Sequence, residues 1–104
     1  MNMKGSLPLL ILQIVASSPK HGYQIAQMIK QFSQGLLDFK EGTLYPTLHG
    51  LEQQGYLEAF SSEENGRTRR YYRLTASGKL ALEKERKEWH AFVQAVNLTL
   101  ESAS

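Results

Sequence analysis

The sequence predicts a mostly α-helical winged helix-turn-helix that carries a small β-hairpin and ends in a long helix. Three segments with apolar residues at helical spacing come first, before residue 55. Two β-prone segments separated by Asn65-Gly66 follow, and Asn-Gly favours the tight turn of a hairpin. A final segment after Thr75 can form one continuous helix. The 104 residues, of which 41% are hydrophobic and 21% charged, suit one small globular unit.

Two helices are predicted in the first third of the chain. The first covers residues 5–17, where Ser6 is a suitable N-cap and Pro8 fits the first turn. The second covers about residues 23–32. Its inward face is expected to hold either Tyr23 or Gln24, together with Ile25, Met28, Ile29 and Phe32. Residues 36–40 are expected to form a short, partly extended connection.

The third predicted helix, residues 41–54, contains both proline and glycine. Its buried face is marked, at steps of four and three, by Leu44, Leu48 and Leu51. Gly42 and Gly50 are poor helix formers, and Pro46 removes a backbone donor. These residues fit a helix whose N-terminal turn faces DNA. A small residue there lets the backbone approach closely, free N–H groups can meet a phosphate, and proline is tolerated near a helix start.

The hairpin is predicted to comprise a strand at residues 56–61, a turn at residues 62–66 and a returning strand at residues 69–74. No acidic residue separates the four arginines Arg67, Arg69, Arg70 and Arg73. A local cluster of basic residues suggests a polyanionic partner. The alternative is a solvated hairpin edge, where charge discourages association between edges. The mild formal net charge of +2 leaves both interpretations open.

In a winged helix-turn-helix, the third helix enters the major groove of DNA and the wing contacts the backbone or the minor groove. The residues predicted to bind DNA are Tyr23, Lys40, Gly42, Thr43, Tyr45, Pro46, His49, Arg67, Arg69 and Arg70. Three of them have a structural alternative. Tyr45 could pack beside the wing, Tyr23 could anchor the second helix, and His49 could be a solvated helix residue.

The C-terminal helix, predicted at residues 76–101, changes character along its length. Charge dominates residues 83–88 and is absent from residues 89–100. An apolar stripe consists of Leu82, Trp89, Val93, Val96 and Leu100, with Phe92 beside it. Such a stripe would be exposed in a monomer, so a second copy is expected to cover it in a two-fold homodimer. The alternative is that it packs on the first helix. The chain is therefore divided into a DNA-binding domain, residues 1–75, and a dimerisation helix, residues 76–104, within one compact unit.

Four stretches resemble the PadR-type transcriptional regulators: LPLLILQIVASSPKHGYQI, EGTLYPTLHGLEQQGYL, NGRTRRYYRLTASG and the helix after them. The resemblance is almost continuous over residues 6–82. It implies a dimeric, usually repressing, DNA-binding protein whose single C-terminal helix makes the dimer. It also implies that Trp89 and Phe92 can line a cavity for a small, flat aromatic effector. Plain packing in the interface is the other role for Trp89.

The sequence departs from the pattern of this family at three positions. Gly50 and Thr68 stand where a basic residue is usual, which removes two candidate contacts with DNA. Lys40 stands where a small polar cap is common, so it weakens the cap of the third helix but adds a candidate phosphate contact. These departures bear on the affinity for DNA rather than on the fold.

Other classes of function have little support in the sequence. The chain has no cysteine, and the spacing of its three histidines matches no metal-ligand motif, so neither metal nor cofactor is expected. No spacing of nucleophile and base indicates an enzyme. The longest apolar run, residues 7–12, is too short to span a bilayer, and no cleavage site follows it, so a cytoplasmic protein without membrane contact is expected. The competing hypotheses are a winged-helix interaction module without DNA binding and a protein that mainly senses a small molecule.

Overall fold

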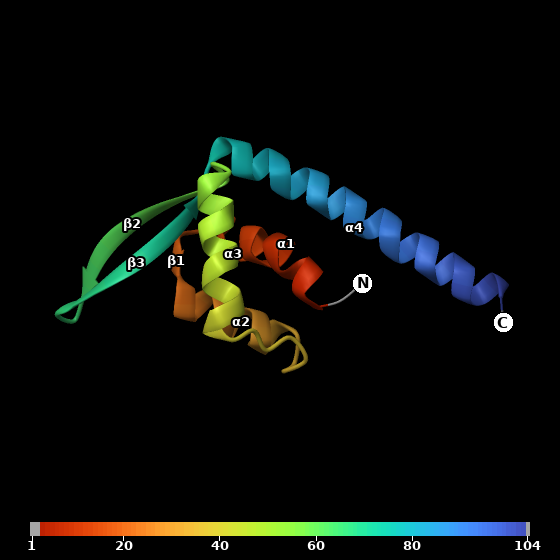
Figure 1. The fold of residues 1–104 in the computed structure, drawn as a ribbon, viewed down its shortest axis with the longest axis horizontal. Coiled ribbons are helices and arrows are strands. Elements are labelled where there is room, and N and C mark those ends of the chain that lie inside the picture. The colour runs from red at the N-terminus through yellow and green to blue at the C-terminus, as the bar shows by residue number, and fades with distance from the viewer. Residues whose placement is uncertain (1–2, 104) are drawn as a thin grey trace.

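The computed structural model describes residues 3–103, and Figure 1 shows a small helical body from which a hairpin and a long helix project. The elements follow in the order α1 (Met3–Val15), β1 (Lys20–His21), α2 (Gly22–Phe32), α3 (Glu41–Gln53), β2 (Leu57–Glu64), β3 (Arg67–Leu74) and α4 (Ala76–Ser102). The predicted order of three helices, a hairpin and a C-terminal helix is confirmed. Residues 1, 2 and 104, which belong to the two predicted domains, lie outside the described residues.

One hydrophobic core joins α1, α2 and α3 to the base of the hairpin and the start of α4. Its buried side chains are Leu7, Ile11, Leu12, Val15, Ile25, Ile29, Leu44, Leu48, Leu51, Leu57, Tyr72 and Leu82. The predicted leucine face of α3 is therefore confirmed. The predicted inward face of α2 is right for Ile25 and Ile29, but Tyr23 and Phe32 are 57% and 67% exposed. Tyr23 lies two residues from Ile25, which places it on the opposite side of the helix, and Phe32 is the last residue of α2.

Proline lies inside both α1 and α3, five residues after the first residue of each helix. Because α1 begins at Met3, Ser6 lies within the helix, and the prediction that Ser6 is its N-cap is wrong. Lys40 precedes α3 without a side-chain capping bond, as its long ammonium side chain has no acceptor to offer. Pro46 has no N–H to donate to the carbonyl of Gly42, so the first turns of α3 are held by fewer helical hydrogen bonds.

A short strand, β1, was not predicted. It joins the hairpin in a three-stranded antiparallel sheet of order β1-β3-β2, with Lys20 opposite Tyr72 and His21 opposite Tyr71. Two residues are too few to show an alternating pattern. His21 also caps α2, because its Nδ1 accepts a hydrogen bond of 3.2 Å from the backbone N–H of Gln24.

The hairpin has longer strands and a tighter turn than predicted. Asn65 and Gly66, with φ angles of 51° and 77°, form the whole connection between β2 and β3. Two residues with positive φ match the twist of the flanking strands, which is why Asn-Gly occurs there. The predicted turn over residues 62–66 is therefore wrong at residues 62–64. Polar side chains suggested a loop there, but they lie on an exposed strand that needs no apolar alternation.

The start of α4 is locked to the end of α3 by short-range contacts. Thr75 caps α4 by accepting a hydrogen bond from the N–H of Gly78, and its hydroxyl donates to the carbonyl of Gly55 at 2.6 Å. Gly78 is buried against Tyr56, and a Cβ there would lie 2.2 Å from the Tyr56 carbonyl oxygen. Only glycine permits this approach of α4 to the backbone before β2.

Candidate nucleic-acid interface and dimerisation surface

The outward face of α3 carries most of the predicted DNA-binding residues. Gly42, Pro46 and His49 are exposed, and they lie opposite the buried leucine face. Thr43 is half-buried, and its carbonyl accepts a hydrogen bond of 2.9 Å from the hydroxyl of Thr47. The side chains on this surface are short or polar, so another molecule can approach the helix backbone closely.

Tyr45 connects α3 to the first turn of α2. Its side chain is 37% exposed, and a Cβ added to Gly22 would lie 2.8 Å from the Tyr45 ring. Burial against α2, aided by the Glu41 carboxylate, raises the pKa of the Tyr45 hydroxyl. Tyr45 therefore packs on α2 rather than beside the wing. With Tyr23 it lines a cleft of about 270 Å³ between α2 and α3.

A cluster of opposite charges lies just before α3. The Lys40 ammonium is 3.2 Å from the Asp38 carboxylate, and Lys30 of α2 is 3.6 Å from the same oxygen. The hydrogen bond from Lys40 and the charge of Lys30 lower the pKa of Asp38. Lys40 is strongly exposed, so it can also reach a second anion while it remains near Asp38.

The four wing arginines differ in their partners. Arg73 forms an ion pair of 2.8 Å with Glu58, the residue opposite it on β2, and its guanidinium lies 4.5 Å from the Phe60 ring centroid. Arg70 forms an ion pair of 2.9 Å with Glu52. Among residues 3–103, no carboxylate lies within ion-pairing distance of Arg67 or Arg69.

An aromatic group joins the wing to α2. The His21 ring lies edge-on to Tyr71 of β3, with 5.5 Å between centroids, and it stacks near Tyr23. Burial lowers the pKa of His21, and the Arg69 charge lowers it further, while Glu64 acts in the opposite sense. The neutral ring is also the form whose Nδ1 can accept the capping bond of α2.

Sequence reasoning missed several residues of this surface, among them Glu52, Glu58 and His21. Glu52 lies 18 residues from its partner in the chain, a separation at which no local pattern pairs two charges. Glu58 could have been found only from the register of the hairpin. His21 was not predicted to cap α2, because serine, threonine, aspartate and asparagine are the usual cap residues.

The apolar stripe of α4 divides at the edge of the body. Leu82 is buried in the core of its own chain, so its predicted place in the dimer interface is unavailable to a partner. The ring centroids of Trp89 and Phe92 are 6.2 Å apart. The two side chains line a pocket of about 170 Å³ against the start of α1. Beyond them, Figure 1 shows α4 projecting past the body, and its residues Val96 and Leu100 are exposed.

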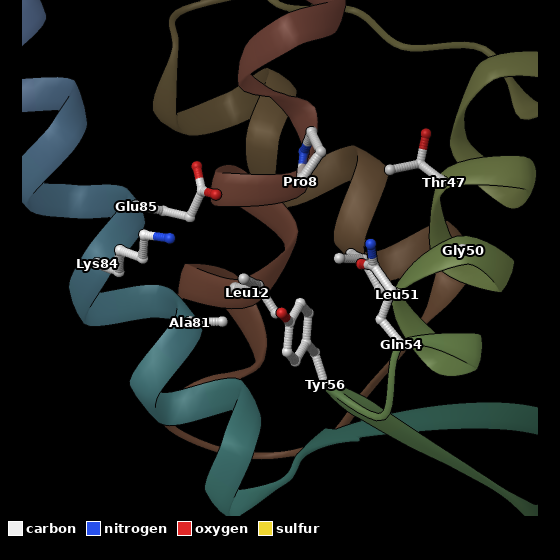
Figure 2. A pocket seen from close by; sticks show the side chains of 10 residues that line it. All are labelled: Pro8, Leu12, Thr47, Gly50, Leu51, Gln54, Tyr56, Ala81, Lys84 and Glu85. Carbon is white, nitrogen blue, oxygen red and sulfur yellow. The ribbon is translucent and has the colours of Figure 1, made fainter.

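A groove of about 390 Å³ separates α3 from α4. Figure 2 shows Ala81, Lys84 and Glu85 on the α4 side and Thr47 and Gln54 on the α3 side, with α1 behind them. Gly50 also lines this groove. A Cβ added there would meet no atom within 4 Å, so the groove has room for a larger residue at this position.

No metal-ligating cluster of histidine, cysteine, aspartate or glutamate occurs in the described part of the chain. Within the same residues, no helix has the length and apolar character needed to cross a membrane.

Comparison with known proteins gave concordant matches. The sequence model of the transcriptional regulator PadR-like family matches residues 11–84. The transcriptional regulator Rv3488 of Mycobacterium tuberculosis is 36% identical over 84 residues, covering 81% of this chain and 76% of that protein. The crystal structure of smu.1704 from Streptococcus mutans has a TM-score of 0.85 and 38% identity, covering 96% of this chain and 90% of that one. A PadR family transcription regulator from Clostridium difficile has a TM-score of 0.80 and 31% identity, covering 92% of this chain and 99% of that one.

Proposed function

Because the chain belongs to the PadR-like family of transcriptional regulators, we propose that it binds a specific DNA operator as a homodimer and represses transcription. Members of this family are regulators rather than enzymes, and they bind DNA and typically dimerise. The observation that carries the proposal is an exposed face of α3 with small residues beside a wing in which Arg67 and Arg69 have no carboxylate partner among residues 3–103.

In this proposal α3 reads the major groove and the wing contacts the DNA backbone. The exposed positions on α3 and beside it provide close approach and polar contacts, and the basic residues neutralise phosphates. The proposed contacts are Tyr23, Lys40, Gly42, Thr43, Tyr45, Pro46, His49, Arg67 and Arg69. Arg70 was also predicted to contact DNA, but a phosphate would have to displace Glu52 from its guanidinium.

Dimerisation is proposed to use the part of α4 that projects beyond the body. Val96 and Leu100 are exposed there, and Val93 is half-buried between them and Trp89. Burial of each aliphatic side chain is worth about 1.5–3 kcal/mol, so a matching helix from a second copy would gain enough to offset part of the cost of association. Residues 1–75 would then act as the DNA-binding domain and residues 76–104 as the dimerisation helix.

Relief of repression by a small aromatic molecule is a further part of the proposal. Its support is the half-open pocket beside Trp89 and Phe92, where a flat apolar ring could be covered by the partner helix. Quenching of Trp89 fluorescence by aromatic compounds would test it directly, because Trp89 is the only tryptophan in the chain.

A gel-shift titration with the promoter of the protein's own operon tests the main proposal. A discrete complex that resists excess unrelated DNA is expected. The mild net charge of +2 favours the alternative, a winged-helix module that binds a protein instead. The alternative gains support if the folded protein gives no shift with this promoter at micromolar concentration and low salt.

A further inference from the structure

The ion pair between Arg70 and Glu52 differs from the other ion pair of the wing in what it connects. Glu58 of β2 and Arg73 of β3 face each other, so their contact joins only the two strands of the hairpin. Glu52 lies in the last turn of α3, so its contact joins the wing to the helix that is proposed to enter the major groove.

The geometry of this pair holds Arg70 in place. One guanidinium nitrogen, Nη2, lies 2.9 Å from Oε2 and 3.2 Å from Oε1 of Glu52, so a single donor contacts both carboxylate oxygens. The guanidinium carbon also lies 5.9 Å from the ring centroid of Tyr72, a core residue of β3. Arg70 thus rests between a buried aromatic ring and the end of α3.

We propose that Glu52 and Arg70 form a positioning pair that fixes the angle of the wing to α3, and that Arg67 and Arg69 make the phosphate contacts of the wing. This inference rests on the proposed DNA-binding function. A guanidinium that stays paired with a carboxylate neutralises no phosphate, so it releases no condensed counterion from the DNA. If it moved to a phosphate, it would leave the Glu52 carboxylate unpaired near a polyanion.

Substitutions of the two partners make the proposal testable, because they change the charge in opposite directions. Glu52→Gln removes a negative charge and Arg70→Ala removes a positive one. If the charges acted on DNA independently, Glu52→Gln would strengthen binding and Arg70→Ala would weaken it. If the two residues position the wing, both substitutions weaken binding, by a similar factor of about 3 to 10.

Fluorescence anisotropy with an operator duplex at several salt concentrations measures both affinity and its salt dependence. Each phosphate contact contributes about 0.9 to the slope of log affinity against log salt, so Arg67→Ala or Arg69→Ala should lower the slope of a dimer by about 1.8. Arg70→Ala and Glu52→Gln should leave the slope unchanged. The double variant should bind no more weakly than either single one, and the exchange Glu52→Arg with Arg70→Glu should restore most of the affinity. Arg73→Ala, which removes the pair within the hairpin, is the matched control and should change neither quantity.

A measurement without DNA separates this inference from the proposed function. The chain has no cysteine, so cysteines introduced at the exposed residues Gln31 and Thr68 can carry two spin labels, one on α2 and one on the wing. Labelled chain diluted in unlabelled chain should give a narrow distance distribution, and both Glu52→Gln and Arg70→Ala should broaden it while thermal melting changes little.

The outcomes are distinct. A wild-type protein that binds no DNA overturns the proposed function, and the spin-label distances then still decide whether the pair fixes the wing. Distributions of equal width in all variants overturn the positioning pair. Two results would show instead that Arg70 is a phosphate contact weakened by Glu52. One is stronger DNA binding by Glu52→Gln. The other is a fall in the slope of log affinity against log salt for Arg70→Ala that equals the fall for Arg69→Ala.

Discussion

At the scale of single residues, Gly78 is the position where one added methyl group has the clearest consequence. Gly78→Ala would place a Cβ 2.2 Å from the Tyr56 carbonyl oxygen and 2.7 Å from a methyl carbon of Leu74. The backbone must shift, and we expect a loss of stability of about 1–3 kcal/mol despite the higher helix propensity of alanine. Urea unfolding measures this loss of unfolding free energy.

Gly50→Ala is the control, since its added Cβ meets open space and should stabilise α3 by about 0.5–1 kcal/mol. Equal effects of the two substitutions would show that the contact at Gly78 is not tight.

Tyr45 tests whether a residue that packs on α2 also serves DNA recognition. Tyr45→Ala should weaken operator binding at least about tenfold and lower the stability by less than about 2 kcal/mol, because the ring is 37% exposed. Gel shift and thermal melting measure the two effects. Tyr45→Phe keeps the ring over Gly22 and should retain the stability. A loss of about 3–5 kcal/mol in Tyr45→Ala, as for a core aromatic residue, would assign Tyr45 to the fold alone.

His21 should make the stability depend on pH. Burial lowers its pKa from the ordinary 6.5, so the unfolded chain binds more protons than the folded chain between the lowered pKa and 6.5. The stabilising effect of the neutral ring is therefore complete above pH 6.5 and is lost as the pH falls through the lowered pKa. Urea unfolding at about pH 5 and about pH 7.5 should show this trend. It should be reduced in His21→Asn, which can still cap α2. An identical pH dependence in the variant would exclude His21 as its source.

At the scale of elements, local signals predicted the order of the helices and the hairpin, although the turn of the hairpin was predicted too long. The leucines of α3 recur at steps of four and three, and Asn65-Gly66 specifies its own turn, so both were predictable. Strand β1 was not, because its two residues are defined only by pairing with β3. The pairing of Glu52 with Arg70 was hidden for a similar reason. It depends on the angle between α3 and the wing, which tertiary packing sets.

The projecting part of α4, residues 93–102, gives the prediction at this scale. Val93→Asp combined with Val96→Asp would place two carboxylates in the proposed interface, and we expect a dissociated but folded monomer. Sedimentation measures the mass, and circular dichroism checks the fold. Glu83→Ala with Lys87→Ala, on the charged part of the same helix, is the control and should remain a dimer. A wild-type monomer at micromolar concentration would show that the stripe needs no partner.

At the scale of the whole molecule, a two-fold dimer would fix the form of the operator. Two α3 helices on one face should meet successive major grooves about 34 Å apart, so the operator should be an imperfect inverted repeat with about 10 base pairs between half-site centres. Footprinting should find this repeat. Insertion of about 5 base pairs between the half-sites turns one of them to the opposite side of the duplex and should abolish tight binding. An affinity that is insensitive to the insertion would contradict a rigid dimer.

Because α4 is long, its contacts with the body, beginning at Gly78, are important for the geometry of the proposed dimer. Helix α4 has 27 residues and is about 40 Å long. Its first part packs on the body through Gly78, Leu82, Trp89 and Phe92, and only residues 93–102, about 15 Å of helix, lie beyond these contacts. A rotation of about 10° of this last part would move its far end by about 3 Å. In the proposed dimer, the contacts from Gly78 to Phe92 would fix the direction of α4 relative to α3, and bending beyond Phe92 would alter the separation of the two α3 helices. The tightness of these contacts would then determine how closely the spacing of the two α3 helices matches the spacing of successive major grooves.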